Sequence, residues 1–102
     1  MAAAGNTLDD ARKEYNNCLV ELHNENVEAK TSASGFRKIA DEGCAEERKK
    51  YTSIMIAEEK RYGSNQAEAT DYANEEADGV AAYIKSAFAE NADKGIKLVP
   101  EQ

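Results

Sequence analysis

The chain contains no tryptophan, one proline, one histidine and two cysteines among its 102 residues. Two cysteines are too few for the disulfide framework of a small secreted domain. A single histidine without a Glu-x-x-His motif excludes the helical di-iron pattern, so we expect no metal and no cofactor. Cys-x-x-Cys pairs, glycine-rich phosphate loops and Ser/His/Asp constellations are also missing, and we therefore expect no enzyme activity.

Long apolar runs and glycosylation signals are missing as well. No segment approaches the ~20 apolar residues of a membrane span, and the sequence Asn-x-Ser/Thr does not occur. Residues 1–6 are small and uncharged, and no apolar run follows them, so we expect no signal peptide. These absences favour a cytoplasmic protein, with secretion without a cleavable signal peptide as the alternative.

Basic residues are outnumbered, with 13 Lys and Arg against 20 Asp and Glu and a net charge of -7. Phosphate backbones are bound by clustered Lys and Arg, so this balance argues against nucleic acid as a partner. Large apolar residues are scarce too: Ala accounts for 18 residues, whereas Leu, Ile, Val and Phe together number 15. Because alanine buries little apolar area, we expect a thin core that favours association with another protein or with itself.

Apolar residues recur at steps of three and four, which predicts α-helices. We expect helices over about 7–31, 36–62 and 65–91, separated by breaks at 31–35 and 62–66. Thr7 is expected to cap the first helix, and Asn65 with Glu68 forms a capping box for the third.

The predicted fold is therefore an all-α, antiparallel three-helix bundle in one domain over 7–91. Residues 1–6 and 92–102 are expected to be flexible tails, although Ile96–Val99 could dock as a short extended piece. In the alternative architecture, one long helix bridges the break at Gly63, and the chain is a two-helix hairpin that dimerises.

The helix expected over 65–91 carries the clearest apolar face, on an otherwise acidic segment. Glu76 falls on the inner stripe, where it could meet Arg48 or Lys49 of the preceding helix. The five tyrosines are expected mostly in the core, with an aromatic patch for a partner as the alternative. The candidate interaction surface consists of Tyr72, Glu75, Glu76, Val80, Tyr83, Ile84 and Phe88.

Cys18 and Cys44 both fall on predicted inner faces, and their midpoint is residue 31, near the first turn. They could therefore lie close together, either as buried free thiols or as a disulfide or redox pair. His23 is expected at the surface or the boundary of the core. Gly43 is expected opposite residues 83–84, where a missing side chain could admit an aromatic ring.

Three short segments resemble known helical families. Residues 72–76 (Tyr-Ala-Asn-Glu-Glu) look like the Tyr-x-x-x-Asp/Glu export motif of the small helical-hairpin proteins of type VII secretion. In this chain, residues 34–36 (Ser-Gly-Phe) stand where those proteins have Trp-x-Gly. Residues 11–15 and 46–51 resemble segments of F-BAR helices, which belong to a membrane-binding domain.

These observations favour a non-enzymatic, acidic helical protein that acts through protein–protein interaction as a subunit or adaptor. The type VII resemblance implies an exported helical hairpin as one alternative. A membrane- or lipid-binding bundle, whose helices open to expose the stripe over 80–88, is another, although the acidic charge makes a membrane partner unfavourable.

Overall fold

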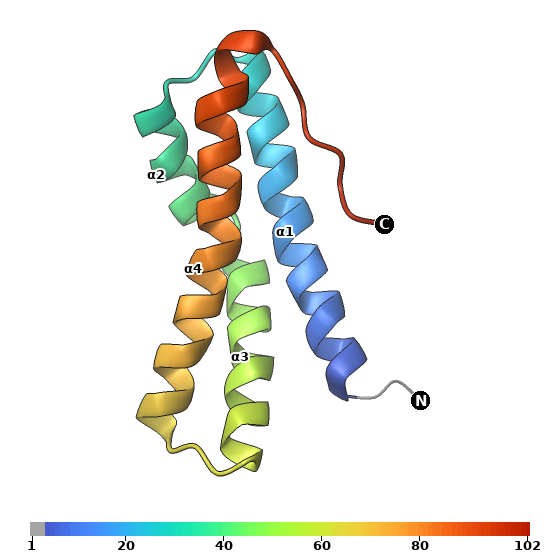
Figure 1. Ribbon diagram of the computed structural model, residues 1–102, viewed down its shortest axis with the longest axis vertical. Coiled ribbons are helices and arrows are strands. Elements are labelled where there is room, and N and C mark those ends of the chain that lie inside the picture. The colour runs from blue at the N-terminus through green and yellow to red at the C-terminus, as the bar shows by residue number, and fades with distance from the viewer. Residues whose placement is uncertain (1–3) are drawn as a thin grey trace.

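The computed structural model describes residues 4–102, and side chains from Thr7 onward. The chain is all-α, as predicted, with no strand within the described residues (Figure 1). Four α-helices and a short 3₁₀ helix follow one another: α1 Ala4–Glu28, α2 Ala33–Gly43, α3 Ala45–Arg61, α4 Gln66–Asn91 and η1 Ala92–Lys94. The prediction of three helices is wrong, because the segment expected as one helix over 36–62 is two.

The interruption between α2 and α3 lies at Cys44, whose backbone leaves the helical region at φ -121° and ψ 39°. Just before it, Gly43 faces α1, where an added Cβ would lie 2.5 Å from Cδ1 of Leu22. Gly43 therefore permits a close approach to α1, and the expectation that it admits an aromatic ring of α4 is wrong. The change of direction at Cys44 lets α2 and α3 each pack against both α1 and α4.

The ends of α1 differ from the prediction. The helix begins at Ala4, so Thr7 is not its N-cap, and only residues 1–3 of the expected N-terminal tail lie outside the described residues. It ends three residues early because Lys30 adopts a left-handed conformation at φ 57°. The amides of Lys30 and Thr31 then donate to the carbonyls of Val27 and Asn26, which is a Schellman motif without glycine.

The turn between α3 and α4 is the one the sequence indicates. Gly63 at φ 109° ends α3 in a second Schellman motif, and the long-helix hairpin alternative is therefore wrong. Asn65 and Glu68 form the expected capping box at the start of α4.

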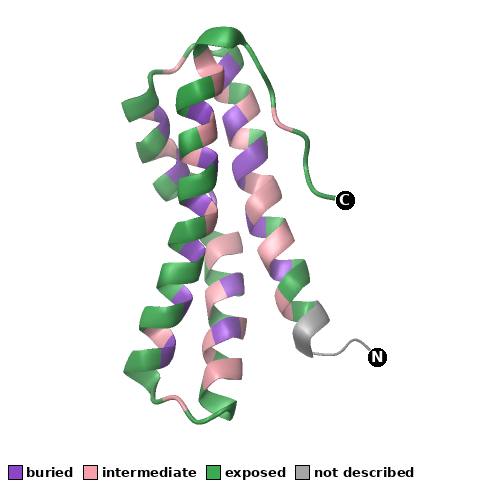
Figure 2. Cartoon of the chain, in the orientation of Figure 1, coloured by how far each residue is buried: buried purple, intermediate pink, exposed green. Residues whose placement is uncertain are grey.

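A buried stripe runs along the inner face of α4 (Figure 2), and it consists mostly of small residues, without the tyrosines expected there. Alanines recur every four residues along the first half of the helix, and the row ends in two large side chains. The buried residues of α4 are Ala69, Ala73, Ala77, Ala81, Ile84 and Phe88. Because alanine keeps side-chain volume low, the α4 backbone can lie close to its neighbours, and Tyr72 and Tyr83 point to solvent instead.

An aromatic cluster joins three helices at the end of the molecule opposite the α3–α4 turn. Phe36 of α2 and Phe88 of α4 stack with their ring centroids 4.2 Å apart. The ring of His23, from α1, meets both edge-on and is fully buried. The surface or boundary placement expected for His23 is therefore wrong, and the second half of α1 is as well packed as the first.

The C-terminal segment after η1 turns back at Gly95, at φ 68°, and runs along the outside of α1 (Figure 1). Leu98 is its half-buried apolar residue, and it packs against the core. No helix within the described residues is long and apolar enough to cross a membrane.

Candidate functional site

A groove of about 420 Å³ lies where α4 meets α1, α3 and the C-terminal segment. Four residues of the predicted interaction surface line it: Glu75, Glu76, Val80 and Tyr83. They share it because they lie within nine consecutive residues of one helix, little more than two turns, on the face beside the buried alanine row. The other lining residues are Arg12, Asn16, Tyr51, Gly79 and Glu101.

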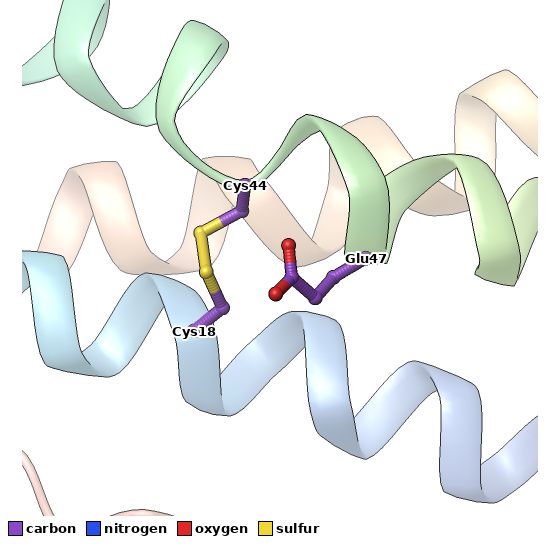
Figure 3. Close-up of side chains that lie close together, drawn as sticks. All are labelled: Cys18, Cys44 and Glu47. Carbon is purple, nitrogen blue, oxygen red and sulfur yellow. A yellow bond between two sulfur atoms is a disulfide. The ribbon is translucent and has the colours of Figure 1, made fainter.

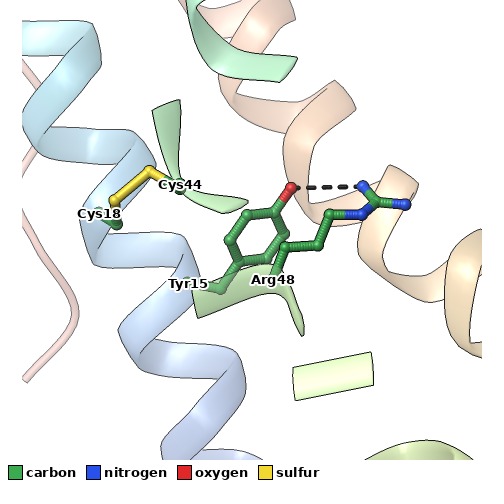
Figure 4. Close-up of a disulfide and its surroundings, with 4 residues drawn as sticks. All are labelled: Tyr15, Cys18, Cys44 and Arg48. Atoms are coloured by element: carbon green, nitrogen blue, oxygen red, sulfur yellow. Dashed lines mark hydrogen bonds between the residues drawn. A yellow bond between two sulfur atoms is a disulfide. The ribbon is translucent and has the colours of Figure 1, made fainter. Parts of the chain in front are cut away.

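Of the three acids that line the groove, Glu101 is paired with Arg12, whereas Glu75 and Glu76 point into solvent without a basic partner. No ion pair or hydrogen bond joins Glu75 or Glu76 to another side chain in the part of the chain that the structure describes. The pairing of Glu76 with Arg48 or Lys49 predicted from sequence is wrong, because Arg48 instead binds Asp78 at 2.8 Å. Arg48 also donates to the hydroxyl of Tyr15 at 3.4 Å (Figure 4).

The wall of the groove combines an acidic rim with a protonated tyrosine. Burial, followed by the negative charge of Glu76, raises the pKa of Tyr51 above its usual value of 10.0. Tyr51 is therefore a neutral phenol at physiological pH. Tyr83, by contrast, is 68% exposed and presents its ring at the mouth of the groove. The groove thus offers a free aromatic face beside two uncompensated carboxylates.

The remaining predicted surface residues divide between surface and core. Tyr72 lies on α4 outside the lining of the groove and is 43% exposed. Ile84 and Phe88 are buried, so neither can contribute to a surface. Of the five tyrosines, Tyr15 and Tyr51 are in the core, and the other three, including Tyr62, are exposed. The core placement expected for most of the tyrosines is therefore wrong for Tyr62, Tyr72 and Tyr83.

Cys18 and Cys44 form a disulfide that ties the middle of α1 to the α2–α3 junction (Figure 3). The interpretation as two free thiols is therefore wrong. Glu47 lies beside the sulfurs, with donor atoms of all three residues within 4.8 Å of one another. Sulfurs bonded to each other are not thiolates, so in this state the cluster offers a metal only the carboxylate of Glu47.

A second depression, of about 580 Å³, lies beside the disulfide and is lined by Cys18, Glu47 and charged residues of α1. Cys18 is half-buried, whereas Cys44 is 1% exposed. A thiolate could therefore reach the disulfide only from the Cys18 side.

His23 contacts the side-chain amides of two asparagines, one on α1 and one on α4. Its Nδ1 lies 2.8 Å from Oδ1 of Asn24, and its Nε2 lies 3.4 Å from Nδ2 of Asn91. An imidazole that donates from Nδ1 and accepts at Nε2 satisfies both amides. The ring is fully buried and far from the groove lining, so it offers neither groove a catalytic base.

Comparisons with protein-family models, with curated proteins and with solved structures find no match for this chain. Its function is therefore inferred from its own residues.

Proposed function

We propose that this protein is a non-enzymatic binding protein that holds a basic segment of a partner protein in the groove between α4 and α1. The observation that carries the proposal is the pair of uncompensated acids, Glu75 and Glu76, beside the exposed ring of Tyr83. A Lys or Arg side chain in the groove would find carboxylates for its charge and an aromatic face for its cation.

The chemistry of the groove suits protein recognition better than catalysis. Tyrosine is enriched among the residues that dominate binding energy at protein interfaces, because it combines apolar area with a polar tip. The net charge of -7 also attracts basic partners over a distance of about a Debye length. The groove contains no nucleophile paired with a base.

We assign the protein to an oxidising compartment rather than to the cytoplasm expected from sequence. The Cys18–Cys44 disulfide supports this placement, because cytosolic thiols are kept reduced and stable disulfides persist mainly outside the cytosol. The proposal thus takes up the alternative of a secreted protein. A chain that is isolated from its native source with two free thiols would contradict the assignment.

The experiment is an NMR titration of the ¹⁵N-labelled chain with two short peptides. One peptide alternates Arg with Phe, and in the other Glu replaces each Arg. We expect the basic peptide alone to shift amide signals, and the shifts to cluster over Glu75–Tyr83. The double variant Glu75→Gln, Glu76→Gln should weaken binding about tenfold or more, as should Tyr83→Ala.

Two variants on other surfaces provide matched controls. Glu90→Gln removes an exposed acid of the same helix, and Tyr62→Ala removes a tyrosine that is 79% exposed outside the groove. Both should bind the basic peptide like the wild type. If the control variants lose as much affinity as the groove variants, the attraction is general to the acidic surface and the proposal fails.

Export by a type VII-like route is the second candidate. It is favoured by Tyr72 and Glu76, which lie one turn apart on the exposed side of α4 and match the spacing of the export motif. The chain has four helices, however, where that family has a hairpin. Tyr72→Ala should abolish export from the native host while the helical content stays unchanged; unaltered export would exclude this candidate.

The lipid-binding alternative requires the helices to separate. Ile84 and Phe88, which would insert into a bilayer, are in the core with 1% and 0% of their surface exposed. Liposome flotation with neutral and anionic vesicles tests this alternative, and absence of binding to both would remove it.

A further inference from the structure

The C-terminal segment is held against α1 by contacts to its backbone, made by two asparagines. Asn24 donates from Nδ2 to the carbonyl of Leu98 at 2.9 Å and accepts from its amide at 2.8 Å. Asn17 makes the same pair of hydrogen bonds with Glu101, both at 2.9 Å. Each asparagine amide thus pairs with one residue as a neighbouring β-strand would. Backbone pairing of this kind does not depend on which side chain the bound residue carries.

Asn17 and Asn24, which we call the two clamps, are spaced to match the repeat of an extended chain. Asn17 and Asn24 are seven residues apart, which is about 10.5 Å along α1 and nearly two full turns, so they lie on the same face. Leu98 and Glu101 are three residues apart, and three residues make one turn of a polyproline II segment, about 9.3 Å long. Pro100 between them fixes a backbone angle suited to that conformation.

Both clamps are positioned in the same way, by the residue before them. The side-chain Nδ2 of Asn16 donates to Oδ1 of Asn17 at 3.2 Å, and Nδ1 of the buried His23 lies 2.8 Å from Oδ1 of Asn24. Because Oδ1 of Asn24 also accepts from the Leu98 amide, the His23 ring must donate there. This repeated arrangement fixes which atom of each amide faces the donor and which the acceptor of the bound chain.

Two charged contacts define which segments fit. Arg12 holds the carboxylate of Glu101 by two parallel hydrogen bonds of 2.7 and 2.8 Å. At the other end, Lys97 lies 2.9 Å from Glu28. Leu98 supplies the one half-buried apolar side chain of the segment, and Val99 between the clamps is 83% exposed. The segment is therefore held by backbone, one apolar side chain and two charges.

We propose that these residues of α1 form a binding track for an extended peptide segment of another protein with one basic and one acidic side chain, and that the chain's own C-terminal segment fills the track in its absence. A fitting ligand has a large apolar residue followed three positions later by a carboxylate, and a basic residue just before the apolar one. The track shares Arg12 and Glu101 with the lining of the α4 groove, but the proposal is argued from the asparagine contacts and not from a basic ligand in that groove.

Competition within the chain makes the track a regulated site. A segment tethered at Gly95 is present at a high effective concentration, so a free peptide binds only when the tether segment is displaced. The test therefore uses the full-length chain with Leu98→Ser and Glu101→Ala, which remove the apolar anchor and the charge that Arg12 binds. Trypsin should then cut after Lys97 at least about tenfold faster than in the wild type.

The probe is a fluorescein-labelled peptide with the sequence of residues 95–102, followed by fluorescence anisotropy. We refer to the double variant as the released chain, and we expect the peptide to bind it at least about tenfold more tightly than it binds the wild type. In the released background, Asn17→Ala removes two hydrogen bonds and should weaken binding roughly tenfold. Asn74→Ala, on the exposed side of α4, is the matched control and should have no effect.

A charge exchange separates recognition from folding. Arg12→Glu in the released chain should lose the probe and gain the peptide that carries Lys in place of Glu101. A released chain that fails to bind the probe would overturn the proposal, as would a segment that stays protected from trypsin in the double variant. Wild-type dimers that form by exchange of these segments, detected by light scattering, would assign the track to a second copy and also refute it.

Discussion

Removal of the Cys18–Cys44 disulfide should destabilise the fold strongly, because the bond closes a loop with a sequence separation of 26 residues. In the chain-entropy account, such a cross-link removes about 12 cal/mol/K from the unfolded state, or about 3.5 kcal/mol at room temperature. Small domains with thin cores have stabilities near the low end of ~5–15 kcal/mol. The loss would therefore remove much of the total, and lower the melting temperature by about 15–25 °C.

The variant to use is Cys18→Ala with Cys44→Ala. Alanine is preferable to serine because Cys44 is 1% exposed, and a serine hydroxyl there would be buried. Urea unfolding followed by circular dichroism, with and without dithiothreitol, gives the free energy of unfolding for both proteins. Reductant should lower the stability of the wild type to near that of the variant, and it should leave the variant unchanged.

A difference below about 1 kcal/mol between oxidised and reduced wild type would refute the reasoning. It would mean that the packing of α1 against the α2–α3 junction is sufficient without the bond.

Four further perturbations test other parts of the structure. Gly79→Ala should raise the free energy of unfolding by about 0.5–1 kcal/mol in the same assay, because an added Cβ meets nothing within 4 Å and alanine favours helix. Gly43→Ala should instead lower it by about 1 kcal/mol, because the new methyl group would press on Leu22. The hydrogen bonds from Arg12 lower the pKa of Glu101. The C-terminal segment should therefore stay docked above the ordinary glutamate pKa of about 4.3 and detach as the pH falls through the lowered pKa. The NMR signal of the Leu98 backbone amide, followed against pH, measures this detachment. Helicity should fall with molecular mass across a hundredfold dilution if the thin core needs association, and a helical monomer that survives dilution would contradict that expectation.

Local signals in the sequence determined the fold class and much of the layout. The helical periodicity predicted an all-α chain, and glycine at position 63 with the Asn65–Glu68 pair located the α3–α4 turn. These predictions hold because caps and turns depend on residues only a few positions apart. The acidic character of α4 was also identifiable from composition, although spacing placed Glu76 on the inner stripe and the structure leaves it exposed.

Only the tertiary structure decided which apolar residues face inward. Periodicity placed Tyr72 and Tyr83 beside Ala73 and Ile84 on one stripe, because neighbouring residues on a helix differ by only about 100°. The close approach of the other helices selected the alanines for the core and left the tyrosines outside. The same packing buried His23, since the two phenylalanines that surround it come from α2 and α4.

The break at Cys44 and the docked C-terminal segment also depended on contacts distant in sequence. Nothing local ends a helix at Cys44, where Gly43 meets Leu22 and the disulfide reaches Cys18. Asn17 and Asn24 read as ordinary polar positions until the chain returns, more than seventy residues later, to place backbone groups against them. Local propensity thus determined the α3–α4 turn and the extent of α4, whereas packing decided where α2 ends, which faces meet and which surfaces remain for binding.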